Sequence, residues 1–360
     1  MNNQDILLSM VCLGIENEIS GCLVLKEEIH KISWDEIHEI ANIQGVSAVV
    51  LDGIEKLPET ERPSQLYLLN WIGEVLQDYE YRYQTYCNTL AELAALYRTN
   101  SIKMMVLKGY ACGIHWPKPE HRPYGDIDIW LFGKHKEADD LLKKSGIQID
   151  GGLHHHTIFI YKDEMVENHF DFVNVHSSRE NKEVEGIFKK LASDDSFKAL
   201  INGQTVYLPS PNLHALFLLK HAKGHFISTS LTLRQLLDWG FFVKENTKLV
   251  DWNWLLPLLD KYHLREFFNR INAICVENLG FSSTIFPYVQ FNPQLKDRML
   301  KDIFKPEFSD DEPKYFFLRI VFKYRRWKAN AWKRRMCGED NDLNMFVRST
   351  WKHLLKPKSI

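Results

Sequence analysis

The sequence predicts an α+β protein in which a small mixed sheet lies between helical regions. Up to Asn100, apolar residues recur at helical spacing, most clearly in QLYLLNWIGEVLQDYEYRYQTYCNTLAELAALYRTN. Short apolar runs typical of strands then replace this pattern, and helical spacing returns after Ser210. We therefore divide the chain into a helical region (1–100), an α/β core (101–210), a helical domain (211–290) and a basic helical region (291–360).

Local signals place the individual elements. Ser33 and Glu36 form a capping-box pattern that predicts a helix start. In the core, IKMMVL (102–107), DIDIWLF (126–132) and TVYLP are strand candidates, and KHKEADDLLKKSG reads as an amphipathic helix closed by Gly146. HTIFIY and MVENHFDFV flank Lys162-Asp163-Glu164, which predicts a hairpin. Ser210 and Pro211 begin the helix NLHALFLLKHA, which we expect to end near Gly224.

Composition excludes several classes of protein. The 360 residues carry a formal net charge of −2, with 26% charged and 45% hydrophobic residues, so there is no overall bias toward nucleic acid or membrane. The six cysteines form no CxxC pair, which argues against a zinc knuckle or a disulfide framework. The N-terminus lacks a basic stretch before its apolar residues, and no uncharged apolar run approaches about 18 residues. We expect a cytoplasmic protein with no signal peptide and no membrane span.

The stretch RPYGDIDIW places two aspartates, Asp126 and Asp128, within an apolar strand. Residues two apart in a strand share a face, so the two carboxylates project together, roughly 6.6 Å apart along the chain. Close carboxylates repel each other, and a divalent cation or a shared proton relieves the repulsion. Carboxylate oxygens suit Mg²⁺, which binds one or two carboxylates together with substrate phosphates. The simpler alternative is two surface aspartates on an edge strand.

Two neighbouring segments strengthen the case for a site. In VLKGYACGI, Gly109 allows close approach of the backbone, the following helix N-terminus favours an anion, and Lys108 could add a charge to a phosphate. In MVENHFDFV, alternation places Glu167, His169 and Asp171 on one face, which could supply a third carboxylate.

The order strand, glycine turn, helix, D-x-D strand, helix and acidic hairpin resembles that of the polymerase-β-like nucleotidyltransferases. More narrowly, LKG followed by R..YGDIDIWL, then VENHF, then LLKHAKGHF...LRQLLDW resembles the bacterial family of uncharacterised nucleotidyltransferases, from the helical front to about residue 290. The superfamily turn usually reads Gly-Gly or Gly-Ser. Here it reads Lys108-Gly109, which keeps the glycine and loses the small hydroxyl donor.

The resemblance implies a polymerase-β-like core that transfers a nucleoside monophosphate from an NTP to a hydroxyl acceptor. It implies two Mg²⁺ ions held by Asp126, Asp128 and Glu167, with Asp171 as the competing third carboxylate. The nucleotide contacts would be Lys108, Gly109, Arg122 and Arg234. Structural pairing is an equal alternative for Arg122, and an i,i+4 ion pair with Asp238 is the simpler one for Arg234. The acceptor is left open among a sugar, a small molecule, a protein and an RNA.

The sequence also leaves three alternative functions open. A catalytically silent nucleotide-binding protein would keep the same cleft. An RNA-modifying nucleotidyltransferase would use the basic segment 319–335. We expect this segment to form a helix after Ser309, packed by its apolar side with a solvated basic face.

A metal-dependent hydrolase would use histidines, but His154, His155 and His156 would alternate faces on a strand and could not all bind one ion. His221 and His225 are spaced i,i+4 on the 210–226 helix, where packing or a substrate contact is favoured.

Overall fold

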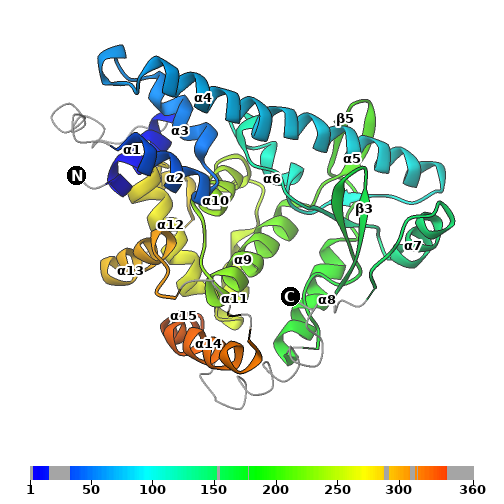
Figure 1. Cartoon of the computed structure of the whole chain (residues 1–360). Helices are drawn as coiled ribbons and strands as arrows, with labels where there is room; N and C mark the ends of the chain where they lie inside the picture. Colours follow the sequence, from blue (N-terminus) through cyan, green and yellow to red (C-terminus); the bar gives the residue numbers. More distant parts are fainter. Residues whose placement is uncertain are drawn as a thin grey trace.

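The computed structural model is a mostly helical α+β protein built around a six-stranded mixed sheet (Figure 1). It describes residues 3–15, 33–151, 155–176, 178–287, 292–308, 313 and 315–338. The predicted α+β class with a mixed sheet is confirmed, and the polymerase-β-like core stays a prediction. The division into four regions stays a prediction.

The N-terminal helices end in one long helical element. Helices α1 (Asn3–Gly14), α2 (Trp34–Gln44) and α3 (Ser47–Glu55) pack together, and the Ser33 side chain accepts a hydrogen bond from the Glu36 N–H, as the capping pattern predicted. Helix α4 (Gln65–Val75) continues through a π-helical segment (Leu76–Tyr81) into α5 (Arg82–Thr99). This element runs from the N-terminal helices to the sheet, as Figure 1 shows. The predicted helical run up to Asn100 is confirmed.

The sheet has the strand order β3-β4-β2-β1-β6-β5. Pairs β2–β4 and β1–β6 are parallel and the other pairs are antiparallel. The strands are β1 (Met105–Val106), β2 (Ile127–Trp130), β3 (His156–Tyr161), β4 (Glu164–His169), β5 (Lys198–Ile201) and β6 (Gln204–Tyr207). Strands β1 and β2 are shorter than the predicted runs 102–107 and 126–132. The edge strand β5 was not predicted, because its Leu200 is exposed and KALI lacks the alternation of a half-buried strand.

The predicted hairpin is confirmed as β3–β4, with a tighter turn. Lys162 and Asp163 form the turn, and both have positive φ (49° and 66°). Such paired positive φ values fit a two-residue hairpin turn. Glu164 belongs to the strand, where it is buried and pairs with Arg82 of α5.

The two faces of the sheet have different neighbours. Ile127, Ile129 and Val166 are fully buried in a cluster with α5 and with α7 (His135–Lys144), so the expectation that Ile127 and Ile129 face the core is confirmed. On the opposite face, the Trp130 ring lies 4.7 Å from the Phe172 ring, near residues of α8 (Arg179–Leu191) and α9 (Pro211–Ser228). The candidate site lies on this second face.

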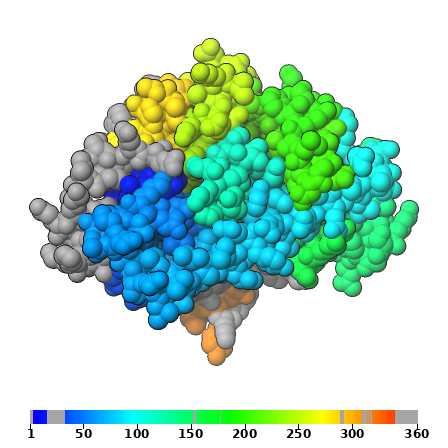
Figure 2. All heavy atoms as spheres, turned by 90° about the horizontal axis from the view of Figure 1, so that it is seen from above, coloured from blue at the N-terminus to red at the C-terminus, as the bar shows by residue number. Residues whose placement is uncertain are grey.

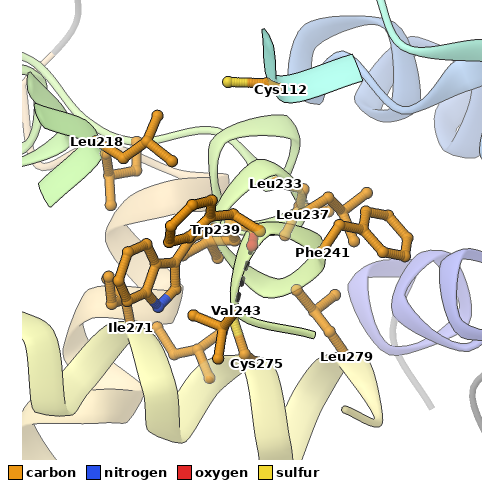
Figure 3. Packing of buried hydrophobic residues seen from close by; sticks show 14 of the residues in the cluster. Cys112, Leu218, Leu233, Leu237, Trp239, Phe241, Val243, Ile271, Cys275 and Leu279 are labelled. Atoms are coloured by element: carbon orange, nitrogen blue, oxygen red, sulfur yellow. Dashed lines mark hydrogen bonds between the residues drawn. The ribbon is translucent and has the colours of Figure 1, made fainter. Parts of the chain in front are cut away.

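The C-terminal helices share a hydrophobic cluster with the N-terminal ones. They are α9, α10 (Leu233–Asn246), α11 (Trp252–Lys261), α12 (Arg265–Leu279) and α13 (Pro293–Phe304). Figure 3 shows α10 and α12 in contact through Trp239, Val243 and Ile271, with the Cys275 thiol donating to the Leu236 carbonyl at 3.5 Å. Helix α9 continues past Gly224 to Ser228, so the predicted end near Gly224 is wrong. One interior glycine costs a helix only about 1 kcal/mol, which tertiary packing overrides.

The basic segment forms two helices, α14 (Phe316–Ala329) and α15 (Ala331–Met336), instead of one. At the break, Asn330 donates to the Ile227 and Ser228 carbonyls at 3.2 and 3.1 Å. The expected solvated basic face is wrong in part. Lys333 is fully buried, 2.6 Å from Asp302, and Arg334 is buried against the Trp327 ring. The expected start at Ser309 lies outside the described residues. Figure 2 shows α14 (orange) projecting from one edge of the molecule.

Two further expectations concern cysteines and membranes. The five described cysteines are buried and form no disulfide with one another, and Cys22 lies outside the described residues. Within the described part of the chain, no helix has the length and apolar character needed to cross a bilayer.

Candidate active site

The register of three strands gathers four polar side chains on one face of the sheet. Asp128 of β2 lies opposite Glu167 of the parallel strand β4, and His156 of β3 lies opposite His169 of β4. Cross-strand partners share a face, and so do Glu167 and His169, which are two residues apart. We call Asp128, His156, Glu167 and His169 the polar cluster.

Asp128 is the buried centre of this cluster. Its Oδ1 atom lies 2.8 Å from Lys108 Nζ and 3.0 Å from His169 Nε2. Burial alone would raise the pKa of the Asp128 carboxyl, but Lys108 and His169 outweigh burial and hold that pKa well below its usual value. Burial lowers the pKa of His169, whereas hydrogen bonds to Asp128 and Glu167 raise it to about 9. Asp128 is therefore ionised between two cationic groups.

Lys108 is placed by the strand that precedes it. The Leu107 N–H donates to the Asp128 carbonyl at 3.0 Å, which fixes the chain beside β2. The Lys108 side chain is 17% exposed and bound to Asp128. Lys108, proposed from the sequence as a phosphate contact, is thus paired with the Asp128 carboxylate in this structure.

Gly109 is needed by the fold itself. Its φ is +54°, and a Cβ added there would lie 2.1 Å from Oη of Tyr86, a fully buried residue of α5. The helix that follows, α6 (Tyr110–Gly113), is only 4 residues long. The positive φ and the close contact with Tyr86 therefore require glycine at this position, whether or not a phosphate binds.

Gly109→Ala is expected to destabilise the protein by at least about 1–3 kcal/mol, because alanine is strained at positive φ and would also displace Tyr86. Urea denaturation would measure the free energy of unfolding. Gly125→Ala is the matched control, since nothing lies within 4 Å of the position of its added Cβ and its φ is not positive. Equal stability of the two variants would contradict this role for Gly109.

Asp126 lies one residue before β2 and is partly exposed. Burial raises the pKa of its carboxyl, the charges of Asp128 and Glu167 raise it further, and Lys108 opposes them without reversing the shift. The side of the site at Asp126 therefore carries excess negative charge. Carboxylate oxygens under mutual repulsion are the donor set that suits Mg²⁺, so these residues fit the implied metal.

The register brings Glu167, and not Asp171, beside Asp128. Glu167 Oε2 lies 3.5 Å from His169 Nε2, and its Oε1 lies 3.6 Å from His156 Nε2. Ligand atoms of Asp128, Glu167 and His169 all lie within 4.8 Å of one another. Asp171 lies beyond the end of β4 and pairs with Lys189 of α8.

Arg122 holds α10 instead of facing the polar cluster. Its guanidinium donates to both carboxylate oxygens of Asp238, at 2.8 and 2.9 Å, and the Trp116 indole N–H donates to Asp238 at 2.9 Å. Burial lowers the pKa of Arg122, but Asp238 raises it by more, so the net shift is upward. Asp238 therefore takes Arg122 as its bidentate partner, where the sequence suggested Arg234.

A cavity of about 60 Å³ adjoins this ion pair and extends to Lys108. Its polar lining includes Arg234 of α10 and His221 of α9, and its apolar lining includes Trp239 and Ile271. Burial and the charge of Arg122 lower the pKa of Arg234. His221 Nε2 lies 3.0 Å from His225 Nε2, and burial together with the charge of Lys108 lowers the pKa of His221. Helices α9 and α10 thus bring a cation and two imidazoles toward the sheet.

Sequence reasoning did not assign His156 and His169 to the carboxylates. The alternation of ENH indicated that Glu167 and His169 share a face, but nothing in the sequence gave the register that places His156 opposite His169. The structure brings Lys108, Asp128 and Glu167 together with Asp126 nearby. It places Arg234 in the adjoining cavity and Arg122 in a buried pair at the cavity wall.

Comparison with known proteins gives a family and no individual relative. Neither the curated proteins nor the solved structures include a significant match to the chain. A family model described as uncharacterised nucleotidyltransferase matches residues 30–280, a range that includes helices α2 to α12 and all six strands of the described sheet. The chain therefore belongs to this nucleotidyltransferase family and is a transferase.

Proposed function

We propose that the protein is a Mg²⁺-dependent nucleotidyltransferase with a polymerase-β-like core, which transfers a nucleoside monophosphate from an NTP to a hydroxyl acceptor. The observation that carries the proposal is the pairing of Asp128 with Glu167 across β2 and β4, in a chain of a nucleotidyltransferase family. A silent nucleotide-binding protein would have no need of this second carboxylate.

Asp126, Asp128 and Glu167 would hold the two Mg²⁺ ions. When bound, the ions would neutralise phosphate charge and lower the pKa of the acceptor hydroxyl. Lys108 and His169 keep Asp128 ionised before any ligand arrives, because both donate to its Oδ1 atom. The carboxylate is thus available as a ligand without first losing a proton.

Lys108 and Arg234 are the proposed contacts of the triphosphate. Lys108 lies at the Gly109 turn and lines the same cavity as Arg234. A phosphate beside Lys108 would compete with Asp128 for the ammonium group, and Arg234 would add a guanidinium suited to phosphate oxygens. Gly109 remains a proposed backbone contact in the same turn. Arg122 contributes by positioning α10 through Asp238, since its buried donors already have a partner.

Glu167→Gln is expected to reduce transfer by about a hundredfold or more, the scale for losing a catalytic base or ligand. Asp171→Asn is the matched control and is expected to cost less than about tenfold, because Asp171 faces Lys189. The measurement is the rate at which label enters a product from α-labelled NTPs with Mg²⁺ and a cell extract as the source of acceptor. The reverse ranking would assign the third carboxylate to Asp171.

The acceptor and the cellular location stay predictions. The acceptor remains a sugar, a small molecule, a protein or an RNA, and the expected location is the cytoplasm. Screening the labelled product by nuclease, protease and size separation would identify the class of acceptor.

A further inference from the structure

We propose that His155, His156 and His169 bind a divalent transition-metal ion of the zinc class. We call these residues the histidine triad. One ring nitrogen from each lies within 4.8 Å of the other two, and the ring centroids are 4.3, 5.1 and 5.7 Å apart. None of the three histidines is a proposed Mg²⁺ ligand, although His169 is hydrogen-bonded to Asp128, and the proposal does not depend on the transferase reaction.

The fold brings the triad together from two strands. His156 and His169 are directly opposite in the antiparallel pair β3–β4, so their rings share a face. His155 lies just before β3, and its carbonyl accepts the N–H groups of Phe170 and Asp171 at 3.0 and 3.1 Å. The alternation expected for consecutive strand residues does not apply to His155, which lies outside the strand, and the third histidine of the triad comes from β4. That His154, His155 and His156 would not all bind one ion stays a prediction. His154 lies outside the described residues.

A buried ring nitrogen supports a ligand at this position. The His156 side chain is almost fully buried, and its Nδ1 atom has no hydrogen-bond partner among the described residues. A buried polar atom without a partner costs free energy, and a bound ion would remove that cost. The other ring nitrogen, Nε2, lies 3.6 Å from Glu167 Oε1.

The chemistry of the donors selects the class of ion. Imidazole nitrogen suits Zn²⁺ and other late transition metals, whereas Mg²⁺ prefers oxygen. Three protein ligands with an open fourth position are a common arrangement for zinc. Asp128 is hydrogen-bonded to His169 Nε2 at 3.0 Å, which is the carboxylate–histidine pairing that orients metal-binding imidazoles. The ion would displace one of the two ring protons of His169 to solvent, because only a neutral imidazole binds a metal.

Metal titration of the full chain tests the proposal without any nucleotide. After removal of bound metal with a chelator, calorimetry should show one Zn²⁺ bound per chain, and excess Mg²⁺ should not displace it. Co²⁺ should give the intense visible bands of a site with four or five ligands. His155→Ala should raise the dissociation constant for Zn²⁺ at least about tenfold. His155 is the informative position because it is the triad member outside the polar cluster.

Two controls separate this site from the carboxylates. His176→Ala removes an exposed histidine outside the triad and should leave Zn²⁺ affinity unchanged. Asp126→Asn removes a proposed Mg²⁺ ligand and should also leave it unchanged, whatever it does to transfer. Circular dichroism of each variant checks the fold, and His156→Ala should repeat the loss seen with His155→Ala. Absence of Zn²⁺ binding, or equal affinity in wild type and His155→Ala, would overturn the proposal.

Discussion

Asp128→Asn is expected to abolish nucleotidyl transfer and to lower the free energy of unfolding by about 3–5 kcal/mol, the scale for breaking a buried ion pair. Lys108 and His169 both donate to Asp128 Oδ1, so the neutral amide removes the buried negative charge that both cationic groups contact directly. Transfer of α-label and urea denaturation at pH 7 measure the two effects. At this pH the stabilising charge is fully present, because the pKa of Asp128 is depressed and its contribution is lost only in acid.

Asp126→Asn is the matched control for this prediction. It should also abolish transfer, but the metal-free protein should keep or gain stability. The pKa of Asp126 is raised by burial and by Asp128, so its ionisation opposes folding at neutral pH, and an uncharged side chain removes that penalty. From the sequence, either substitution would relieve repulsion between the two carboxylates. Equal loss of stability in both variants would contradict the charge distribution described for the site.

Arg122→Met is the second change for which we expect a large effect. It should lower the free energy of unfolding by about 3–5 kcal/mol, because Asp238 would remain buried with only the Trp116 indole as a donor. The variant also loosens α10, which carries Arg234, so NTP affinity should fall along with stability. Denaturant unfolding and nucleotide titration measure the two quantities.

Arg234→Met is the control on the same cavity. Its side chain is partly exposed and no ion pair is found for it among the described residues, so unfolding should change by less than about 1 kcal/mol. Triphosphate binding should nevertheless weaken by more than nucleoside binding. If Arg234→Met proves as destabilising as Arg122→Met, the division into a positioning arginine and a phosphate-binding arginine is wrong.

The N-terminal helices and most elements of the core could be predicted from the sequence, because helix starts and periodicity are local signals. Ser33 is an example, since its side chain and Glu36 lie three residues apart. The strands were less predictable. Met105–Val106 is a strand only because β2 and β6 flank it, and Lys198–Ile201 only because it pairs with Gln204–Tyr207. The neighbours that define such short strands lie elsewhere in the chain.

The candidate site, too, could be predicted only in part from local sequence signals. The D-x-D spacing predicted that Asp126 and Asp128 share a face of the strand. Alternation left both Glu167 and Asp171 as candidates for the third carboxylate. Only the parallel register of β2 and β4 pairs Glu167 with Asp128. The Arg122–Asp238 pair joins residues 116 positions apart, and His156 meets His169 through a hairpin register. These contacts depend on tertiary packing, which local spacing does not encode.

The most direct test of nucleotidyl transfer compares one NTP labelled at the α-phosphate with the same NTP labelled at the γ-phosphate. Wild-type protein, Mg²⁺ and a cell extract should move α-label into a larger product and release γ-label as pyrophosphate. Asp126→Asn and a chelator should each stop both events. Movement of γ-label into the product, or incorporation of α-label that survives in Asp126→Asn, would contradict a nucleotidyltransferase site built on these carboxylates.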